Sequence, residues 1–330
     1  MQAPLHDAEK GTLTRRTTRF EISPELTDDA RMSSPLLNLT IRVGCRIAYE
    51  VAVPTPALCV VQPRHDERTL LRGEQLSFGI AKLLEEFTDS FGNNTHRLMF
   101  MPGRNEIHHD ALIAVSSLPD KQTMDGAVLP VGQLPVEVLP YTLPSRYCDS
   151  DKLRDFAWKH FGHVDNGLLR VKAICDWVHS NIEYRFGSGR PDISAAEVIE
   201  CRYGVCRDFA HTALALCRAF NLPARYVTGH LPDIGYIDPG SPMDFHAYCE
   251  IYLGREWLTF DPRYNVPRIG RAKVAHGMDA VNGAFTTIYG EAKLAHFEVW
   301  AYQVRPGEVS VGDPIDLSKR LDGAEIVRLS

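Results

Sequence analysis

Long hydrophobic runs are missing from this chain of 330 residues, and none approaches the roughly 20 apolar residues that span a bilayer. No apolar signal core stands near the N-terminus either. A large excess of charge of one sign is also absent, because 36 basic residues accompany 42 acidic ones and leave a formal net charge of −6. Such a chain lacks the basic footprint that attracts nucleic acids or anionic membranes. We therefore expect a cytoplasmic protein with neither of these partners.

Sequence signatures of bound metals and cofactors are absent as well. The chain has no Gly-x-Gly-x-x-Gly run, phosphate loop, His-Glu-x-x-His pair or Gly-x-Ser-x-Gly elbow. Its eight cysteines form no Cys-x-x-Cys pair, which predicts mostly reduced, buried thiols. A zinc site built from Cys201, Cys206 and His211 lacks a fourth ligand at a usable spacing. The pair His108-His109 is predicted to lie in an exposed loop at a strand start, so we expect no obligatory metal or cofactor.

Composition and periodicity divide the chain into five predicted parts. Its 44% hydrophobic content is sufficient for cores in two domains. Alternating apolar residues at 39–51, 57–62, 95–101 and 110–117 predict an antiparallel β domain. The expected parts are a loose, polar N-terminal segment at 1–33, the β domain at 34–128, a Pro-rich linker at 129–144, a mixed catalytic domain at 145–305 and a C-terminal extension at 306–330. Within the first part, Met32 is an alternative start of the protein.

Helical spacing replaces strand alternation after residue 150. Apolar residues step by three or four near 151–161 and again from 167 to 185. Asp165 or Asn166 is the expected cap of the second of these helices. Ser194 and Glu197 form the capping-box pattern of a further short helix that ends near residue 201.

A cysteine stands where a glycine-containing turn becomes a helix. Cys206 follows Gly204 closely, and from Phe209 to Phe220 the apolar residues recur at helical spacing. Cys206 is therefore placed in the first helical turn, where unpaired N–H groups and the helix macrodipole favour a thiolate. We expect its pKa to lie below the usual value of about 8.5 and its sulfur to be nucleophilic.

A base and an orienting carboxylate are predicted from one hairpin. The segments on either side of Gly254-Arg255 alternate apolar and polar residues. If these two residues form the turn, His246 and Asp261 become diagonal neighbours on one sheet face, about 7–8 Å apart at Cα and within reach of a side-chain hydrogen bond. Cys206, His246 and Asp261 then form a thiol triad by role. The opposite face is predicted to be core and carries Phe245, Ala247, Cys249, Ile251, Leu253, Leu258 and Phe260.

Three separated segments together resemble the transglutaminase-like superfamily of papain-type thiol enzymes. They are the turn and helix of Cys206, the strand of His246, and the run Trp257-Leu-Thr-Phe-Asp261-Pro262. The regions 49–109 and 144–152 further resemble bacterial transglutaminase-like cysteine proteases with an N-terminal β domain. The resemblance implies an α+β fold, in which the helix bearing Cys206 packs on an antiparallel sheet and a β domain precedes this core. Arg207 departs from the pattern, because many bacterial relatives have glutamine there.

Loops and further strands are expected around this core. Residues 187–191 are predicted either to shape a substrate groove or simply to turn the chain. Residues 229–244 form a polar loop that we interpret as a lid, and its aspartates lack the spacing of a calcium loop. Tyr184 and Trp177 fit the core better than the site. His276 and the segment 283–289 are expected to complete the catalytic sheet, and 296–304 to form a final strand.

The predicted chemistry is acyl transfer through a thioester. The Cys206 thiolate would attack a carboxamide of a peptide or protein, while His246 moves the proton and Asp261 holds the tautomer. The backbone N–H of Cys206 is the expected oxyanion donor, with Tyr203 and Arg207 as further oxyanion or substrate-binding candidates. Hydrolysis by a cysteine peptidase or amidase is favoured, because nothing marks a second, amine-admitting tunnel. Two alternatives stay open: a protein-glutamine gamma-glutamyltransferase, and a non-catalytic binding module on the same fold.

Overall fold

Segments with alternating apolar residues form strands, and segments with apolar residues three or four apart form helices. The structure is a computed structural model that describes residues 37–64, 69–123, 127–237, 242–323 and 325–326. The predicted loose segment 1–33, Met32 included, lies outside these residues, as do Asp238, Pro239 and Gly240 of the predicted lid. The described residues all belong to one compact unit.

The described strands build three antiparallel sheets of four strands each and one short parallel pair. The sheet orders are β14-β1-β6-β3, β13-β2-β5-β4 and β11-β10-β9-β12, with β7 beside β8. The strands are β1 (Leu37–Val51), β2 (Thr55–Cys59), β3 (Thr69–Ser77), β4 (Lys82–Thr88), β5 (Asn94–Phe100), β6 (Gly103–Ser116), β7 (Glu183–Tyr184), β8 (Tyr203–Gly204), β9 (Ala224–His230), β10 (His246–Leu253), β11 (Glu256–Phe260), β12 (Ala272–Gly277), β13 (Thr286–Ile288) and β14 (Lys293–Val304).

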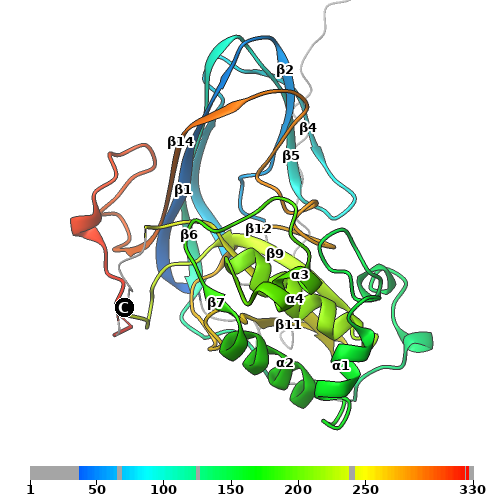
Figure 1. The fold of residues 1–330 in the computed structure, drawn as a ribbon. Coiled ribbons are helices and arrows are strands. Elements are labelled where there is room, and N and C mark those ends of the chain that lie inside the picture. The colour runs from blue at the N-terminus through cyan, green and yellow to red at the C-terminus, as the bar shows by residue number, and fades with distance from the viewer. Residues whose placement is uncertain (1–36, 65–68, 124–126, 238–241, 324, 327–330) are drawn as a thin grey trace, which may run out of the picture. The chain divides into compact units, whose positions relative to one another are not determined.

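The helices come mainly from the middle of the chain. They are α1 (Arg154–Phe161), α2 (Leu168–Asn181), α3 (Ala195–Cys201) and α4 (Cys206–Arg218), with short 3-10 turns η2 (Val131–Gln133), η3 (Leu139–Thr142) and η4 (Leu317–Lys319). Figure 1 shows α1 to α4 gathered beside the sheet that contains β9 and β11. Helix α4 packs directly on β10 and β9, and its buried face joins the inner face of the sheet in one hydrophobic core. The predicted α+β class, with a β region before the core of helices and sheet, is confirmed.

The first two sheets are completed by strands from the far end of the chain. β14 pairs with β1 along almost its whole length, from Thr40↔Val304 to Glu50↔Lys293. β13 pairs with β2, where Thr286 lies opposite Cys59. The prediction that 283–289 completes the catalytic sheet is therefore wrong, although 272–277, which contains His276, does pair there as β12. The domain boundaries at 34–128 and 145–305 stay a prediction.

The interpretation of His108-His109 as an exposed loop is also wrong. Both residues lie inside β6, and the side chain of His109 is completely buried. His109 Nε2 lies 2.8 Å from Glu74 Oε1, and the neighbouring Asp110 forms a buried ion pair with Arg42 at 2.8 Å. These polar partners make burial tolerable, and hydrophobicity alone does not indicate them.

Helix caps agree with the sequence in one case and differ in another. The backbone N–H of Ser194 donates to Glu197 Oε2 at 2.7 Å, as the capping-box pattern of α3 predicts. Neither Asp165 nor Asn166 caps α2, because Gly167 occupies the N-cap position with φ 97°. Asn166 Oδ1 instead accepts a hydrogen bond from Arg170 at 3.0 Å.

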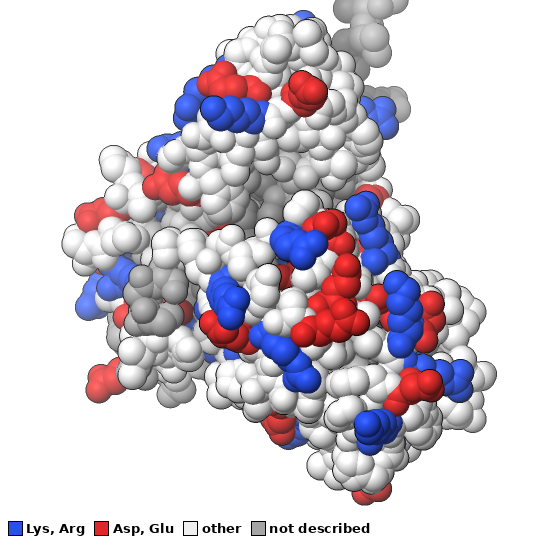
Figure 2. Space-filling model, viewed as in Figure 1, with Lys and Arg blue, Asp and Glu red and all other residues white. Residues whose placement is uncertain are grey.

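Charged side chains of both signs share the molecular surface. On the face shown in Figure 2, blue and red side chains lie next to one another over the region of the helices. Exposed ion pairs such as Arg185–Glu183 at 2.6 Å and Arg190–Asp192 at 3.1 Å contribute to this mixture. Within the described ranges, no helix combines the length and apolar character needed to cross a bilayer.

Candidate active site

The start of α4 is built by a tight backbone arrangement around Cys206. The parallel pair of β7 and β8 fixes the chain just before the helix, with Tyr184 opposite Gly204. A Cβ at Gly204 would lie 2.7 Å from the Cβ of Asp208, so a larger residue does not fit there. Asp208 Oδ2 accepts a hydrogen bond at 2.9 Å from the N–H of the N-cap residue Val205. Cys206 therefore stands at the first helical position, as predicted.

The hairpin that carries the histidine has the predicted register. Leu253 pairs with Glu256 across a two-residue turn, and the pairing continues to Cys249 and Phe260. Gly254 and Arg255 both adopt positive φ, 58° and 74°, as a turn matched to the strand twist requires. The core face is as predicted with one exception: Phe245 is buried in a different cluster, which it shares with residues of β1 and β2. The reason is that Phe245 precedes β10 and contacts Phe285, with ring centroids 3.6 Å apart.

His246 and Asp261 meet directly. His246 Nε2 lies 2.7 Å from Asp261 Oδ2, and both side chains are buried. Arg271 Nη2 donates to the same oxygen at 2.8 Å, and the backbone N–H of Tyr264 donates to Asp261 Oδ1 at 3.3 Å. Although burial alone would raise it, the pKa of Asp261 lies well below its usual range because of His246 and Arg271. The carboxylate is thus ionised and fully oriented.

The imidazole of His246 is neutral at pH 7 in the resting protein. Burial lowers its pKa below 6.5, and the attraction of Asp261 only partly opposes this effect. An ionised carboxylate at Nε2 accepts a hydrogen bond, so the proton of the neutral ring is on Nε2. The lone pair of Nδ1 is then the basic site.

The expectation of a lowered thiol pKa at Cys206 is wrong. Burial raises the pKa of Cys206 to about 11, and a hydrogen bond with the backbone of Ala247 offsets this only in part. The residue keeps some exposure at the wall of a cavity, but the helix start does not outweigh the loss of solvation. The cavity wall consequently carries a neutral thiol and a neutral imidazole in the resting protein.

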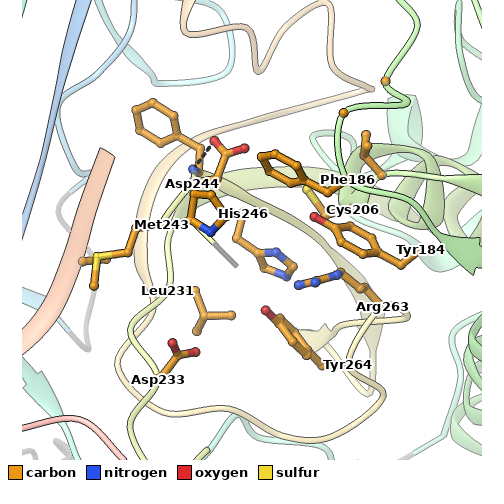
Figure 3. A pocket seen from close by; sticks show the side chains of 16 residues that line it. Tyr184, Phe186, Cys206, Leu231, Asp233, Met243, Asp244, His246, Arg263 and Tyr264 are labelled. Atoms are coloured by element: carbon orange, nitrogen blue, oxygen red, sulfur yellow. Dashed lines mark hydrogen bonds between the residues drawn. The ribbon is translucent and has the colours of Figure 1, made fainter. Parts of the chain in front are cut away.

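A cavity of about 370 Å³ gives access to the sulfur and the imidazole. Cys206 and His246 both line it. Figure 3 shows the two side chains within one ring of residues that includes Tyr184, Phe186, Arg263 and Tyr264. Residues on both predicted loops contribute to the wall: Gly187 and Gly189 from one loop, and Leu231, Asp233, Pro242, Met243 and Asp244 from the other. The loop at 187–191 therefore shapes the cavity rather than merely turning the chain.

Several cavity residues were missed or undervalued by the sequence analysis, among them Tyr184, Arg263 and Tyr264. Tyr184 lines the cavity, whereas Trp177 packs against Phe156 with ring centroids 5.2 Å apart, as expected of the core. The guanidinium of Arg263 lies 3.6 Å from the ring centroid of Tyr184 and 4.4 Å from that of Tyr264. Arg263 and Tyr264 follow the Asp261-Pro262 pair directly, so their position in the sequence was an available signal.

Other candidates from the sequence lie away from the cavity. Tyr203 and Arg207 are not among its lining residues, and Arg207 donates instead to the backbone carbonyl of Arg190 at 2.5 Å. Of the residues weighed for zinc, Cys201 Sγ contacts the carbonyl of Tyr203 at 3.4 Å. His211 Nε2 accepts from the N–H of Ala280 at 3.1 Å. Among the described residues, no group of three or more His, Cys, Asp or Glu side chains is arranged to hold a metal ion.

A cysteine at a helix start, packed on an antiparallel sheet that carries a histidine bonded to an aspartate, defines the papain-like class of folds. The Transglutaminase-like superfamily profile matches residues 155–262, which contain all three of these side chains. A solved structure described as a "putative cysteine protease" from Cytophaga hutchinsonii is 34% identical, with a TM-score of 0.72. The match covers 81% of this chain and 91% of that one. The chain belongs to the transglutaminase-like superfamily.

Curated relatives match a smaller region. An uncharacterized protein of Mycobacterium leprae is 32% identical over 99 residues, which are 29% of this chain and 35% of the relative. An uncharacterized protein of Mycobacterium tuberculosis is 31% identical over 125 residues, which are 34% of this chain and 38% of the relative. The matches thus span little more than a third of these curated relatives.

Proposed function

We propose that this protein is a thiol acyl-transfer enzyme in which Cys206 is the nucleophile, His246 the general base and Asp261 the orienting carboxylate. The observation that carries the proposal is the 2.7 Å contact between His246 and Asp261 beside a cavity that Cys206 also lines. Each of the three residues taken alone has an ordinary structural explanation. A base already oriented by a carboxylate, on the wall of the same cavity as a helix-start cysteine, fits the requirements of nucleophilic catalysis.

The first half of the proposed reaction forms a thioester. As the sulfur of Cys206 attacks the carboxamide carbon, Nδ1 of His246 removes the thiol proton, because the resting thiol is neutral. The carbonyl oxygen becomes an oxyanion, for which the backbone N–H of Cys206 is the proposed donor, since the first N–H groups of a helix lack partners within it. The C–N bond then breaks, His246 returns the proton to the departing nitrogen, and ammonia or an amine leaves.

The second half is proposed to be hydrolysis. Water attacks the thioester carbon while His246 accepts its proton, and the C–S bond breaks to regenerate the thiol and release a carboxylic acid. The second described cavity, of about 460 Å³, is lined neither by Cys206 nor by His246. None of the other cavities among the described residues reaches the sulfur, which favours a cysteine peptidase or amidase over a transferase that needs a separate entrance for an amine. The proposed substrate is an amide bond of a peptide or protein.

The proposed setting is the cytoplasm, without nucleic acid or membrane as a partner. All eight cysteines, Cys206 included, are free thiols in the structure. Free thiols suit a reducing compartment, where structural disulfides are rare. The interspersed charges on the face shown in Figure 2 agree with the small net charge of the chain.

Incubation of the protein with a glutamine-bearing peptide, with and without a labelled primary amine, tests the proposal. Ammonia release without amine incorporation is expected, and Cys206→Ala should abolish it. Cys201→Ala is the matched control, because this half-buried cysteine is five positions away and does not line the cavity. Incorporation of the amine in place of hydrolysis would identify a transglutaminase. Equal activity of Cys206→Ala and wild type would contradict the nucleophile, and no turnover of any amide in a peptide library would favour the binding module.

A further inference from the structure

Arg271 is the third member of a buried charge network behind the imidazole. It stands immediately before β12, and its side chain is 7% exposed. Its Nη2 donates at 2.8 Å to Asp261 Oδ2, which is also the oxygen that binds His246 Nε2. Its Nε donates at 2.9 Å to Asp120 Oδ2. One guanidinium thus bridges the carboxylate at the base to a second carboxylate from a distant segment.

The position of this guanidinium is fixed from several sides. Asp120 is itself anchored, since its Oδ2 accepts from the N–H of Arg268 at 2.9 Å and its own N–H donates to the carbonyl of Arg268 at the same distance. The guanidinium carbon of Arg271 also lies over the ring of Tyr248, 4.3 Å from the ring centroid. A planar group held by two carboxylates and a ring has little rotational freedom, so Asp261 is held with it.

We propose that Arg271 is a positioning residue that orients Asp261 toward His246 and limits the basicity of the imidazole. The inference rests on the proposed function, because it assigns Arg271 a role within that triad. Without the cation, Asp261 would be a buried carboxylate with the imidazole as its main partner, and the pair would stabilise a proton on the ring. With the cation, the negative charge is shared and His246 stays neutral in the resting state.

The remaining charges near His246 do not replace Arg271. Arg263 also carries positive charge, but it approaches from the cavity side and does not hydrogen-bond Asp261. The carboxylate of Asp244 at the cavity wall raises the pKa of His246, opposite to the effect of Arg271. The titratable and charged groups that surround the imidazole or line its cavity are Tyr184, Cys206, Asp233, Asp244, Tyr248, Asp261, Arg263, Tyr264 and Arg271.

The second cavity offers a direct route for a chemical test. Arg271 lines this space of about 460 Å³, and its Nη1 has no hydrogen-bond partner among the described residues. If the side chain is removed, a guanidinium ion added to the solution has space to enter behind Asp261. Millimolar guanidinium is far below the molar range that unfolds proteins.

The test measures the pKa and tautomer of His246 by NMR of its ring nitrogens, in wild type, Arg271→Ala and Arg271→Lys. We expect the pKa to rise by about one unit or more in Arg271→Ala, because a nearby cation is lost. The acid limb of kcat/KM should move upward with it, and kcat should fall about tenfold or more at little change in KM. Added guanidinium should reverse both effects, whereas sodium chloride at equal ionic strength should not. The His246 pKa and the kcat of Arg271→Lys should lie between those of wild type and those of Arg271→Ala.

Arg42 provides the matched control for the loss of a buried arginine. It forms an ion pair of 2.8 Å with Asp110 and is 1% exposed, but it lies in another sheet. Arg42→Ala should leave the His246 titration unchanged in the folded fraction. An unchanged titration in folded Arg271→Ala, or an equal shift in Arg42→Ala, would overturn the inference. If Arg271→Ala does not fold, the His246 titration is measured in Arg271→Lys and Asp120→Asn instead. An unchanged His246 pKa in both variants would refute the inference. The NMR titration needs no turnover, so its outcome is independent of whether the proposed function holds.

Discussion

His246 and Asp261 are 15 positions apart in the sequence, and their side chains meet at 2.7 Å because a two-residue turn sets the register between their strands. The contact lies on the polar face of the hairpin. The opposite face belongs to the core beneath α4, whose first residue is Cys206. One local feature, the turn at Gly254-Arg255, therefore determines where the imidazole of His246 and the carboxylate of Asp261 meet.

Replacing Asp261 by asparagine should abolish most activity while preserving the shape of the site. The amide removes the charge that holds the proton of His246 on Nε2, so the wrong tautomer becomes accessible. We expect kcat to fall by about 10²–10⁴, measured as ammonia release from a glutamine-bearing peptide. Asp279→Asn is the control, because this carboxylate is also buried but binds the N–H groups of Tyr147 and Val281. Full activity in Asp261→Asn would contradict the assigned role.

Alkylation of Cys206 should reveal a neutral thiol rather than a resting thiolate. Burial raises its pKa to about 11, so the rate with iodoacetamide should still be increasing above pH 9, beyond the pKa of about 8.5 of a free thiol. Mass spectrometry after trypsin digestion separates this site from the buried Cys217 and Cys249, which serve as internal controls. A rate plateau that begins below pH 7 would instead demonstrate a preformed thiolate–imidazolium pair.

Mild acid should destabilise the fold through its buried histidines. Burial lowers the pKa of His230 to about 3 and that of His276 to about 2, and it lowers those of His211 and His246 as well. The unfolded chain binds these protons near pH 6.5 and the folded chain does not, so the stabilisation is complete above that pH and is lost below it. His230 and His276 each contribute a loss of about 1.4 kcal/mol per pH unit between 6.5 and their folded-state pKa.

Urea unfolding at pH 7 and pH 5 measures this loss. Asp244 and Asp322 act in the opposite direction, because burial raises the pKa of each, to about 6 for Asp244, but these two carboxylates do not offset four histidines. Both ring nitrogens of His230 lack hydrogen-bond partners among the described residues. His230→Phe should therefore reduce the pH dependence, in contrast to the exposed-site variant Lys152→Gln. Equal or greater stability at pH 5 than at pH 7 would contradict the prediction.

The turn residue Arg255 offers a prediction for stability alone. Its φ of 74° lies in the left-handed region, which costs about 1 kcal/mol for a residue with a Cβ. Arg255→Gly should raise the melting temperature by a few degrees without altering activity, and the β-branched Arg255→Val should lower it. Differential scanning calorimetry checks both. A gain in stability for the valine variant would indicate that the turn is not of the assigned type.

The parts of the site that depend on local geometry were predictable from the sequence. A helix start is marked by its periodicity, and a two-residue turn converts sequence spacing into cross-strand pairs, so Cys206 and His246 were placed correctly on their elements. Asp261 was predicted within the second strand and instead follows its last residue, Phe260. Arg271 was not identified, because its contact with Asp261 requires the position of β12 beside β9. Pairing between strands distant in sequence has no local signature.

Other errors have related physical causes. β4 was missed because it is an exposed edge strand, with Glu85 and Glu86 where apolar alternation would be needed. The strand β13 was assigned to the wrong sheet, since its short apolar run does not specify a partner. The pKa of Cys206 was misjudged because the helix start is visible in the sequence, whereas the burial that outweighs it depends on the assembled cavity wall.

The covalent state of Cys206 during turnover tests the central claim most directly. Protein mixed with a glutamine-bearing peptide and quenched in acid after a fraction of one turnover should carry the acyl group of the peptide, with loss of ammonia, as a thioester on Cys206. Hydroxylamine should remove it, and Cys206→Ala should not form it. Product formation without any adduct on Cys206, or an adduct that persists in Cys206→Ala, would contradict the account.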